Sequence, residues 1–172
     1  EIYTVSYTLS LHDALPITRA GSVSGFPVSS IDFLPTILEM AGARAPRAGA
    51  VDGLSLAPLL RGGAAPRRSE LYWHYPHYSN QGGTPGGAIR DGDWKLIEFY
   101  EDGWLELYNL REDPGETRNL AAREPKRAAA LHGKLKRWRG SVNASMPVPN
   151  PAYDPAGADQ KLTGHEPRTP PA

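Results

Sequence analysis

Residues 88–120, AIRDGDWKLIEFYEDGWLELYNLREDPGETRNL, contain two Asp-Gly pairs that divide the segment into three short apolar stretches. Asp-Gly favours tight hairpins because glycine readily adopts positive φ. The stretches 88–90, 94–100 and 104–109 are therefore predicted to be strands of an antiparallel meander. Upstream, ELYWHY at 70–75 shows the period-2 alternation of a strand with one buried face, Leu71, Trp73 and Tyr75 against Tyr72 and His74, and supplies a fourth strand.

A helix is predicted to follow the meander. Pro125 stands at an early helical position, where its missing N–H is harmless. An apolar stripe at helical spacing follows it, made of Leu131, Leu135, Trp138 and Val142. The sequence thus predicts an α+β subdomain, in which a four-stranded antiparallel sheet at about 71–109 is covered on one face by a helix at about 125–142.

A shorter helix is predicted nearer the N-terminus. Ser29 and Ser30 precede the apolar run IDFLPTILEMAGA, which ends in glycine, as helix start and stop signals require. Pro35 is tolerated only in the first turn, so the regular helix is expected at about 34–41. Its apolar face combines Ile31, Leu34, Ile37, Leu38 and Ala41. A further helical turn is expected at 56–60.

Composition narrows the possible functions. The chain has 172 residues, enough for one domain or one small domain with tails, and a formal net charge of zero, so charge favours neither nucleic acid nor an anionic membrane. It contains no cysteine, which excludes disulfides and thiolate metal sites. No apolar run approaches the roughly 20 residues that span a bilayer, and the N-terminus does not look like a signal peptide.

The decisive segment also resembles a known family. AIRDGDWKLI, ELYNLREDP and GETRNL follow one another as they do near the C-terminus of sulfatases, the sulfate-ester hydrolases of the alkaline-phosphatase-like fold. Upstream, VSSIDFLPT at 28–36 and DGLSLAPLLRG at 52–62 match that family's pattern as well. The resemblance covers about 28–155. It implies the C-terminal portion of an arylsulfatase-like sulfuric ester hydrolase, with the terminal helix of the large α/β domain before the small α+β subdomain.

This resemblance implies a division of the chain. Residues 19–66 would end the large domain, 67–143 would form the C-terminal subdomain, and 144–172 would be a proline-rich extended tail, partly disordered after about Asp154. Residues 1–18 do not look like the family sequence expected there. They are interpreted as a non-native segment, with an ordinary first strand as the alternative.

The chemistry that the resemblance implies lies outside this chain. Sulfatases use a formylglycine made from Cys or Ser within C/S-x-P-x-R, together with Ca²⁺. Here cysteine is absent, and Ser145-Met146-Pro147 is followed by Pro149 where arginine is required. No catalytic residue and no metal ligand is therefore assigned, and the chain alone is expected to be inactive. Its expected partners are a preceding catalytic domain and a sulfated small molecule or carbohydrate, with no nucleic acid. The family's usual location is the periplasm or outside the cell.

Two histidines in YWHYPHY, His74 and His77, are the candidate site residues. H-x-x-H could share a metal on a helix, but Pro76 between them favours an extended segment. Aromatic packing at a strand end is a second interpretation. Contact with a sugar ring or sulfate oxygens is the third, with His77 preferred over His74, because a similar Pro-His-Tyr stretch lies near the active-site mouth of carbohydrate sulfatases.

The remaining charged and glycine-rich patterns are open to structural interpretations. The glycine-rich loop at 79–87 could cradle an anion but is better explained as a connector. The charges around the first hairpin and the following elbow are expected to be structural; they are Arg90, Asp93, Lys95, Arg111, Asp113 and Glu116. The helix at 123–139 carries seven Lys or Arg residues and one acid, Glu124. A solvated face is the default there, and a strip that binds a sulfated polysaccharide is the alternative.

Two other functions therefore remain open beside the sulfatase interpretation. A free-standing, non-catalytic module could bind an anionic glycan through the sheet, the His77 loop and the basic helix. A purely structural remnant of an enzyme is the third possibility.

Overall fold

A computed structural model describes residues 18–43, 50–79 and 83–152 and divides the chain into two compact units, residues 1–68 and 69–172. Three predicted features lie wholly or partly outside the described residues: the non-native segment, the middle of the glycine-rich loop and the end of the tail. Among the described residues, no helix is both long and apolar enough to cross a membrane.

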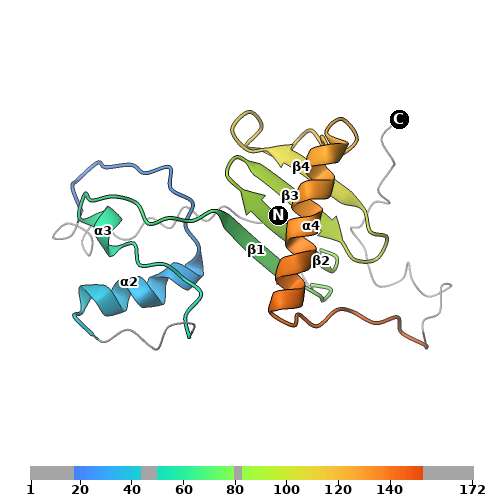
Figure 1. Cartoon of the computed structure of the whole chain (residues 1–172), viewed down its shortest axis with the longest axis horizontal. Helices are drawn as coiled ribbons and strands as arrows, with labels where there is room; N and C mark the ends of the chain where they lie inside the picture. The colour runs from blue at the N-terminus through green and yellow to red at the C-terminus, as the bar shows by residue number, and fades with distance from the viewer. Residues whose placement is uncertain (1–17, 44–49, 80–82, 153–172) are drawn as a thin grey trace. The chain divides into compact units, whose positions relative to one another are not determined.

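The unit at 69–172 contains a four-stranded antiparallel sheet whose strands neighbour one another in chain order (Figure 1). Its strands are β1 (Glu70–Tyr75), β2 (Gly86–Asp91), β3 (Trp94–Phe99) and β4 (Leu105–Asn109). The predicted meander is therefore confirmed.

The two Asp-Gly pairs turn the chain as expected. Asp91 pairs with Trp94, which leaves Gly92 and Asp93 as a two-residue loop. Gly92 has φ of 59°, and Gly103 in the next turn has φ of 70°, a conformation that most side chains disfavour.

One strand is longer than predicted. Gly86 and Gly87, expected in the preceding loop, extend β2, where Gly86 pairs with Tyr75 on one side and Phe99 on the other. A Cβ on Gly87 would collide with the hydroxyl of Tyr100. The glycines therefore let a neighbouring side chain approach the backbone closely, a role that composition alone does not distinguish from loop flexibility.

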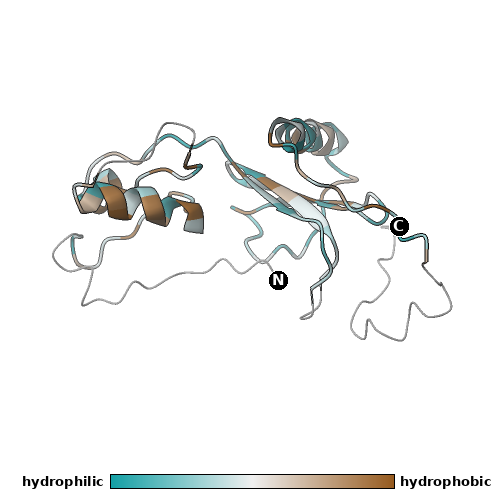
Figure 2. Cartoon of the chain, turned by 90° about the horizontal axis from the view of Figure 1, so that it is seen from below, coloured by the Kyte–Doolittle hydropathy of each residue, from teal (hydrophilic) through white to brown (hydrophobic). Residues whose placement is uncertain are grey.

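Helix α4 (Pro125–Ser141) lies across one face of this sheet, as Figure 2 shows with the sheet nearly edge-on. The fully apolar core between them consists of Ile89, Leu96, Leu107, Ala128, Leu131 and Leu135. Trp138 packs at its margin. Val142, the last member of the predicted stripe, lies beyond the helix end and is 52% exposed, so the stripe ends at Trp138.

Strand β1 differs from its predicted pattern. The side chain of Tyr72 packs with the α4 core, although its face was expected to be the polar one. On the other face Leu71 is buried, whereas Tyr75 is 52% exposed. Both faces of this edge strand are thus partly covered, because Tyr72 presents an aromatic ring to the helix.

The unit at 1–68 has only short helices in its described part: η1 (Ser30–Asp32), α2 (Phe33–Met40) and α3 (Ala57–Leu60). They confirm the two predicted helical segments, with Pro35 in the first turn of α2. Several apolar side chains of η1 and α2 are exposed within this unit; they include Ile31, Phe33, Leu34 and Ile37. The predicted apolar face is thus largely uncovered there.

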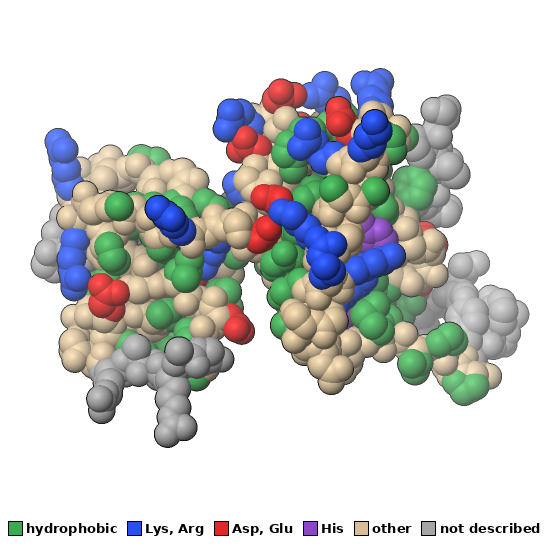
Figure 3. All heavy atoms as spheres, in the orientation of Figure 1, with side chains coloured by type: hydrophobic (Ala, Val, Ile, Leu, Met, Phe, Trp, Pro, Cys, Tyr) green, Lys and Arg blue, Asp and Glu red, His purple; other side chains and the backbone are tan. Residues whose placement is uncertain are grey.

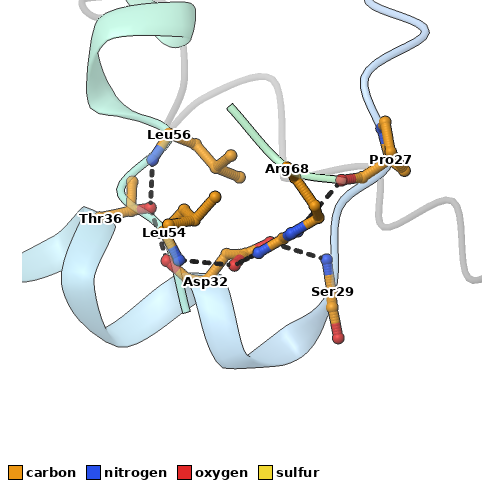
Figure 4. Close-up of polar contacts among 7 residues, drawn as sticks. All are labelled: Pro27, Ser29, Asp32, Thr36, Leu54, Leu56 and Arg68. Carbon is orange, nitrogen blue, oxygen red and sulfur yellow. Dashed lines mark hydrogen bonds and ion pairs between the residues drawn. The ribbon is translucent and has the colours of Figure 1, made fainter. Parts of the chain in front are cut away.

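A buried carboxylate organises this unit (Figure 4). Asp32 is fully buried and accepts hydrogen bonds from the backbone N–H groups of Ser29 and Leu54, each at 2.9 Å. The guanidinium of Arg68 donates to both Asp32 oxygens, at 2.7 Å for Nη1, and to the carbonyl of Pro27. Burial alone raises the pKa of Asp32, but the bonds from Arg68, Leu54 and Ser29 outweigh it and hold the pKa below its ordinary value.

Candidate functional site

His77, the preferred site residue, lies just beyond the end of β1 and is exposed. Its ring meets Tyr75 edge-on, with centroids 5.7 Å apart and planes at 87°. Tyr78 is also exposed and donates its hydroxyl to Glu101 at 2.6 Å. The strand end thus presents an imidazole among aromatic side chains, a combination that suits a sugar ring with polar substituents.

His74 lies in β1 and is held by both ring nitrogens. Nδ1 lies 2.6 Å from the hydroxyl of Tyr100, and Nε2 lies 2.7 Å from the backbone carbonyl of Ser145. A carbonyl can only accept, so Nε2 carries a proton and donates it to Ser145, while Nδ1 and the Tyr100 hydroxyl share the second hydrogen bond. Burial raises the pKa of Tyr100, which keeps this hydroxyl protonated. His74 therefore ties the segment after α4 to the sheet.

The interpretation of H-x-x-H as a metal site gains no support. Among the residues that the structure describes, no group of three or more His, Cys, Asp or Glu side chains could hold a metal ion. The packing interpretation fits His74, because both of its nitrogens bind protein atoms. Substrate contact stays a prediction, and the geometry leaves His77 better placed for it than His74.

Behind His74 lies a buried charged cluster that the sequence patterns did not identify. The carboxylate of Glu98 lies 2.9 Å from Nε2 of His132 and 2.7 Å from Nη1 of Arg139. The Arg139 guanidinium also lies over the ring of Tyr100, 5.1 Å from its centroid. The cluster fixes Tyr100 and, through it, His74. Its only sequence signal is the seven-residue spacing of His132 and Arg139, which places both on the sheet-facing side of α4.

The charges around the hairpin and elbow are structural, as predicted. Arg111 pairs with Asp93 at 2.7 Å, and the buried ammonium of Lys95 contacts both oxygens of Glu116 at 2.7 Å. Asp113 accepts the backbone N–H groups of 117 and 118. These two bonds, ahead of every other influence, hold the pKa of Asp113 below its ordinary value.

Asn119 completes the elbow and covers the outer edge of β4. Its Oδ1 accepts from the backbone N–H groups of Leu107 and Ala121, and its Nδ2 donates to the carbonyl of Leu105. The side chain thus satisfies backbone groups that an edge strand would otherwise leave unpaired.

The basic helix is only partly a solvated face. Lys134 contacts Glu70 at 2.8 Å and Asp91 at 2.7 Å, and these hydrogen bonds, led by Asp91, raise the pKa of Lys134. The guanidinium of Arg127 lies 4.2 Å from the ring centroid of Trp94. With Arg139 bound to Glu98, three of the seven predicted basic residues are held by the sheet or by an aromatic ring.

Comparison with known proteins adds a second line of information. Residues 2–140 match the family model described as N-sulphoglucosamine sulphohydrolase, C-terminal. A sulfatase of Formosa agariphila is 40% identical over 131 residues, covering 68% of this chain and 24% of that protein. A delta 4,5-hexuronate-2-O-sulfatase of Bacteroides thetaiotaomicron is 37% identical over 108 residues, covering 59% of this chain and 21% of that protein.

A solved structure shows the same fold. It is a protein in complex with its substrate D-glucosamine-2-N,6-O-disulfate, with 31% identity and a TM-score of 0.64, and the match covers 77% of this chain and 28% of that one. The chain thus spans about a quarter of the length of the relatives that it matches.

Proposed function

The chain belongs to the sulfatase family, and from this premise we propose that it is the C-terminal portion of an enzyme that hydrolyses sulfate monoesters of a carbohydrate. The observation that carries the proposal is the match of residues 2–140 to the C-terminal region of a sulfatase family. Carbohydrate sulfatases among the relatives, and a structural relative bound to a disulfated glucosamine, support a sulfated sugar as substrate. The family resemblance supports a periplasmic or secreted location.

The reacting groups would be supplied by a preceding portion of the protein. Formylglycine requires Cys or Ser in C/S-x-P-x-R, and this chain has no cysteine and no arginine after Ser145-Met146-Pro147 at the required place. The described residues include no candidate cluster for Ca²⁺. The sequence therefore does not fit formylglycine, the described residues offer no fit for Ca²⁺, and we assign no chemical step to them.

With the reacting groups supplied by the preceding portion, His77 of this chain would contact the substrate. Its ring is exposed at the end of β1 beside Tyr75, where it could donate to a sulfate or hydroxyl oxygen. His74 would act as a positioning residue, because its bonds to Tyr100 and Ser145 fix the strand from which the His77 loop departs.

The test compares the 172-residue chain with a longer protein that includes the upstream coding sequence. We expect the chain alone to release no sulfate from an aryl sulfate or from a sulfated glucosamine, and the longer protein to release it. In the longer protein, His77→Ala should raise KM for the sulfated sugar without changing the unfolding midpoint, since the side chain is exposed. A longer protein without sulfatase activity would overturn the proposal, and an unchanged KM would remove His77 from it.

A further inference from the structure

A groove between β1 and α4 combines aromatic, cationic and hydroxyl side chains. It is an open surface depression of about 360 Å³, lined by Glu70, Tyr72, Lys134, Arg137, Trp138 and Ser141. The two elements that form it are the edge strand of the sheet and the second half of the helix that covers it. This groove is separate from the His77 loop, which contributes none of the lining residues.

Two stacked rings give the groove its apolar wall. Tyr72 and Trp138 lie parallel, with centroids 4.8 Å apart and planes at 7°. Both side chains pack against the core but are partly exposed, so part of each ring remains accessible to solvent. The parts of the two rings that remain exposed form a fixed apolar surface for the C–H groups of a sugar, because they add contact area without further ordering of the protein.

The two cations along the groove differ in whether they already form ion pairs. Lys134 is held between Glu70 and Asp91, so its charge is balanced and its position is fixed. Arg137 is exposed and takes part in none of the ion pairs found among the described residues. A guanidinium binds the oxygens of a sulfate group through two parallel hydrogen bonds. Arg137 is therefore the side chain of this wall best suited to bind an anion, whereas Glu70 already accepts hydrogen bonds from Lys134 and Ser69.

Further cations extend along the same helix. Lys126 and Lys136 are exposed, and the space-filling view shows Lys and Arg side chains gathered along α4 (Figure 3). A polyanion with successive sulfate groups complements such a strip better than a single small anion does.

We propose that this groove binds a sulfated sugar unit of a polysaccharide, with the sugar ring against the Tyr72–Trp138 pair and a sulfate group on Arg137. Such binding would hold a polymeric ligand on the outer side of α4, and it requires no reacting group from the rest of the protein. It goes beyond the proposed hydrolysis and would stand even if the longer protein proved inactive.

The test is calorimetric titration of the chain with a sulfated heparin tetrasaccharide. Arg137→Gln should weaken binding about tenfold, which corresponds to about 1.4 kcal/mol. Arg118→Gln is the matched control, because it makes the same substitution at an exposed position on the elbow, which neither lies on α4 nor lines the groove. It should weaken binding less than about twofold, as expected for an exposed charge that acts only through a screened field.

Other outcomes would overturn the proposal. Equal losses in the two variants would show diffuse charge attraction instead of a site. Equal binding of the desulfated tetrasaccharide would remove the role of sulfate, and no binding of the sulfated one would remove the site altogether. Because both substitutions are at exposed positions, circular dichroism of each variant should match that of the parent chain.

Discussion

Trp138→Ala tests how α4 is attached to the sheet. The ring stacks on Tyr72 at 4.8 Å and packs against the apolar core, but it remains partly exposed. Truncation of a fully buried tryptophan costs about 3–5 kcal/mol, and an aromatic pair adds about 0.5–1.5 kcal/mol beyond its buried area. For this half-buried ring we expect a loss of about 2–4 kcal/mol in the free energy of unfolding.

The loss is measured by urea unfolding of the sheet-and-helix unit, followed by far-UV circular dichroism. In a thermal scan it corresponds to a fall in Tm on the order of 10–20 °C. Val142→Ala is the control, because Val142 belongs to the same sequence stripe but is exposed, and it should change the free energy by less than about 0.5 kcal/mol. Equal effects of the two substitutions, or none for Trp138→Ala, would refute the packing described here.

Three further predictions concern other parts of the chain. Arg68→Leu leaves Asp32 buried without its charged partner and should lower the free energy of unfolding of the first unit by about 3–5 kcal/mol in urea. Arg61→Leu is the control, because it breaks an exposed pair at 3.6 Å and should cost less than about 0.5 kcal/mol. Similar losses in the two variants would contradict a structural role for the buried pair. Hydrogen bonds depress the pKa of Asp113, so the stability that they give to the elbow is present above the ordinary carboxyl pKa and is lost as the pH falls through the depressed value. Hydrogen-exchange protection of the Thr117 amide should therefore fall over that acidic range. Protection that does not change with pH would argue against this role of Asp113. The exposed apolar face of α2 should make the chain self-associate, so light scattering should show a larger mass for the parent chain than for the Ile37→Lys variant. If both proteins are monodisperse monomers, self-association through α2 is excluded.

The sheet was predictable because its signals are local. Asp-Gly turns and short alternating stretches fix the strands and their order, and the structure confirms all four. The extent of β2 was not predictable, because Gly86 and Gly87 have the composition of a loop but take part in pairing with both neighbouring strands. Helix α4 was likewise identified from Pro125 and the stripe, which in fact ends at Trp138 instead of Val142.

The polar clusters were harder to predict, because their members are distant in sequence. Arg68 lies thirty-six positions after Asp32 in the sequence. Glu98 in β3 pairs with His132 and Arg139, which lie seven positions apart on α4. His74 appeared as a substrate candidate, yet its partners Tyr100 and Ser145 lie on later segments that no local pattern connects to β1. The structure is therefore needed to distinguish His74, whose two ring nitrogens are hydrogen-bonded, from the exposed His77.

The central claim, that this chain is the C-terminal portion of a sulfatase, is tested most directly by reading the coding sequence upstream of position 19. We expect one open frame that continues into residue 19 and encodes C-x-P-x-R, or its serine form, within a large α/β domain. A stop codon followed by a genuine start near Glu1 would contradict the claim and would leave a separate module that binds sulfated glycans as the better account.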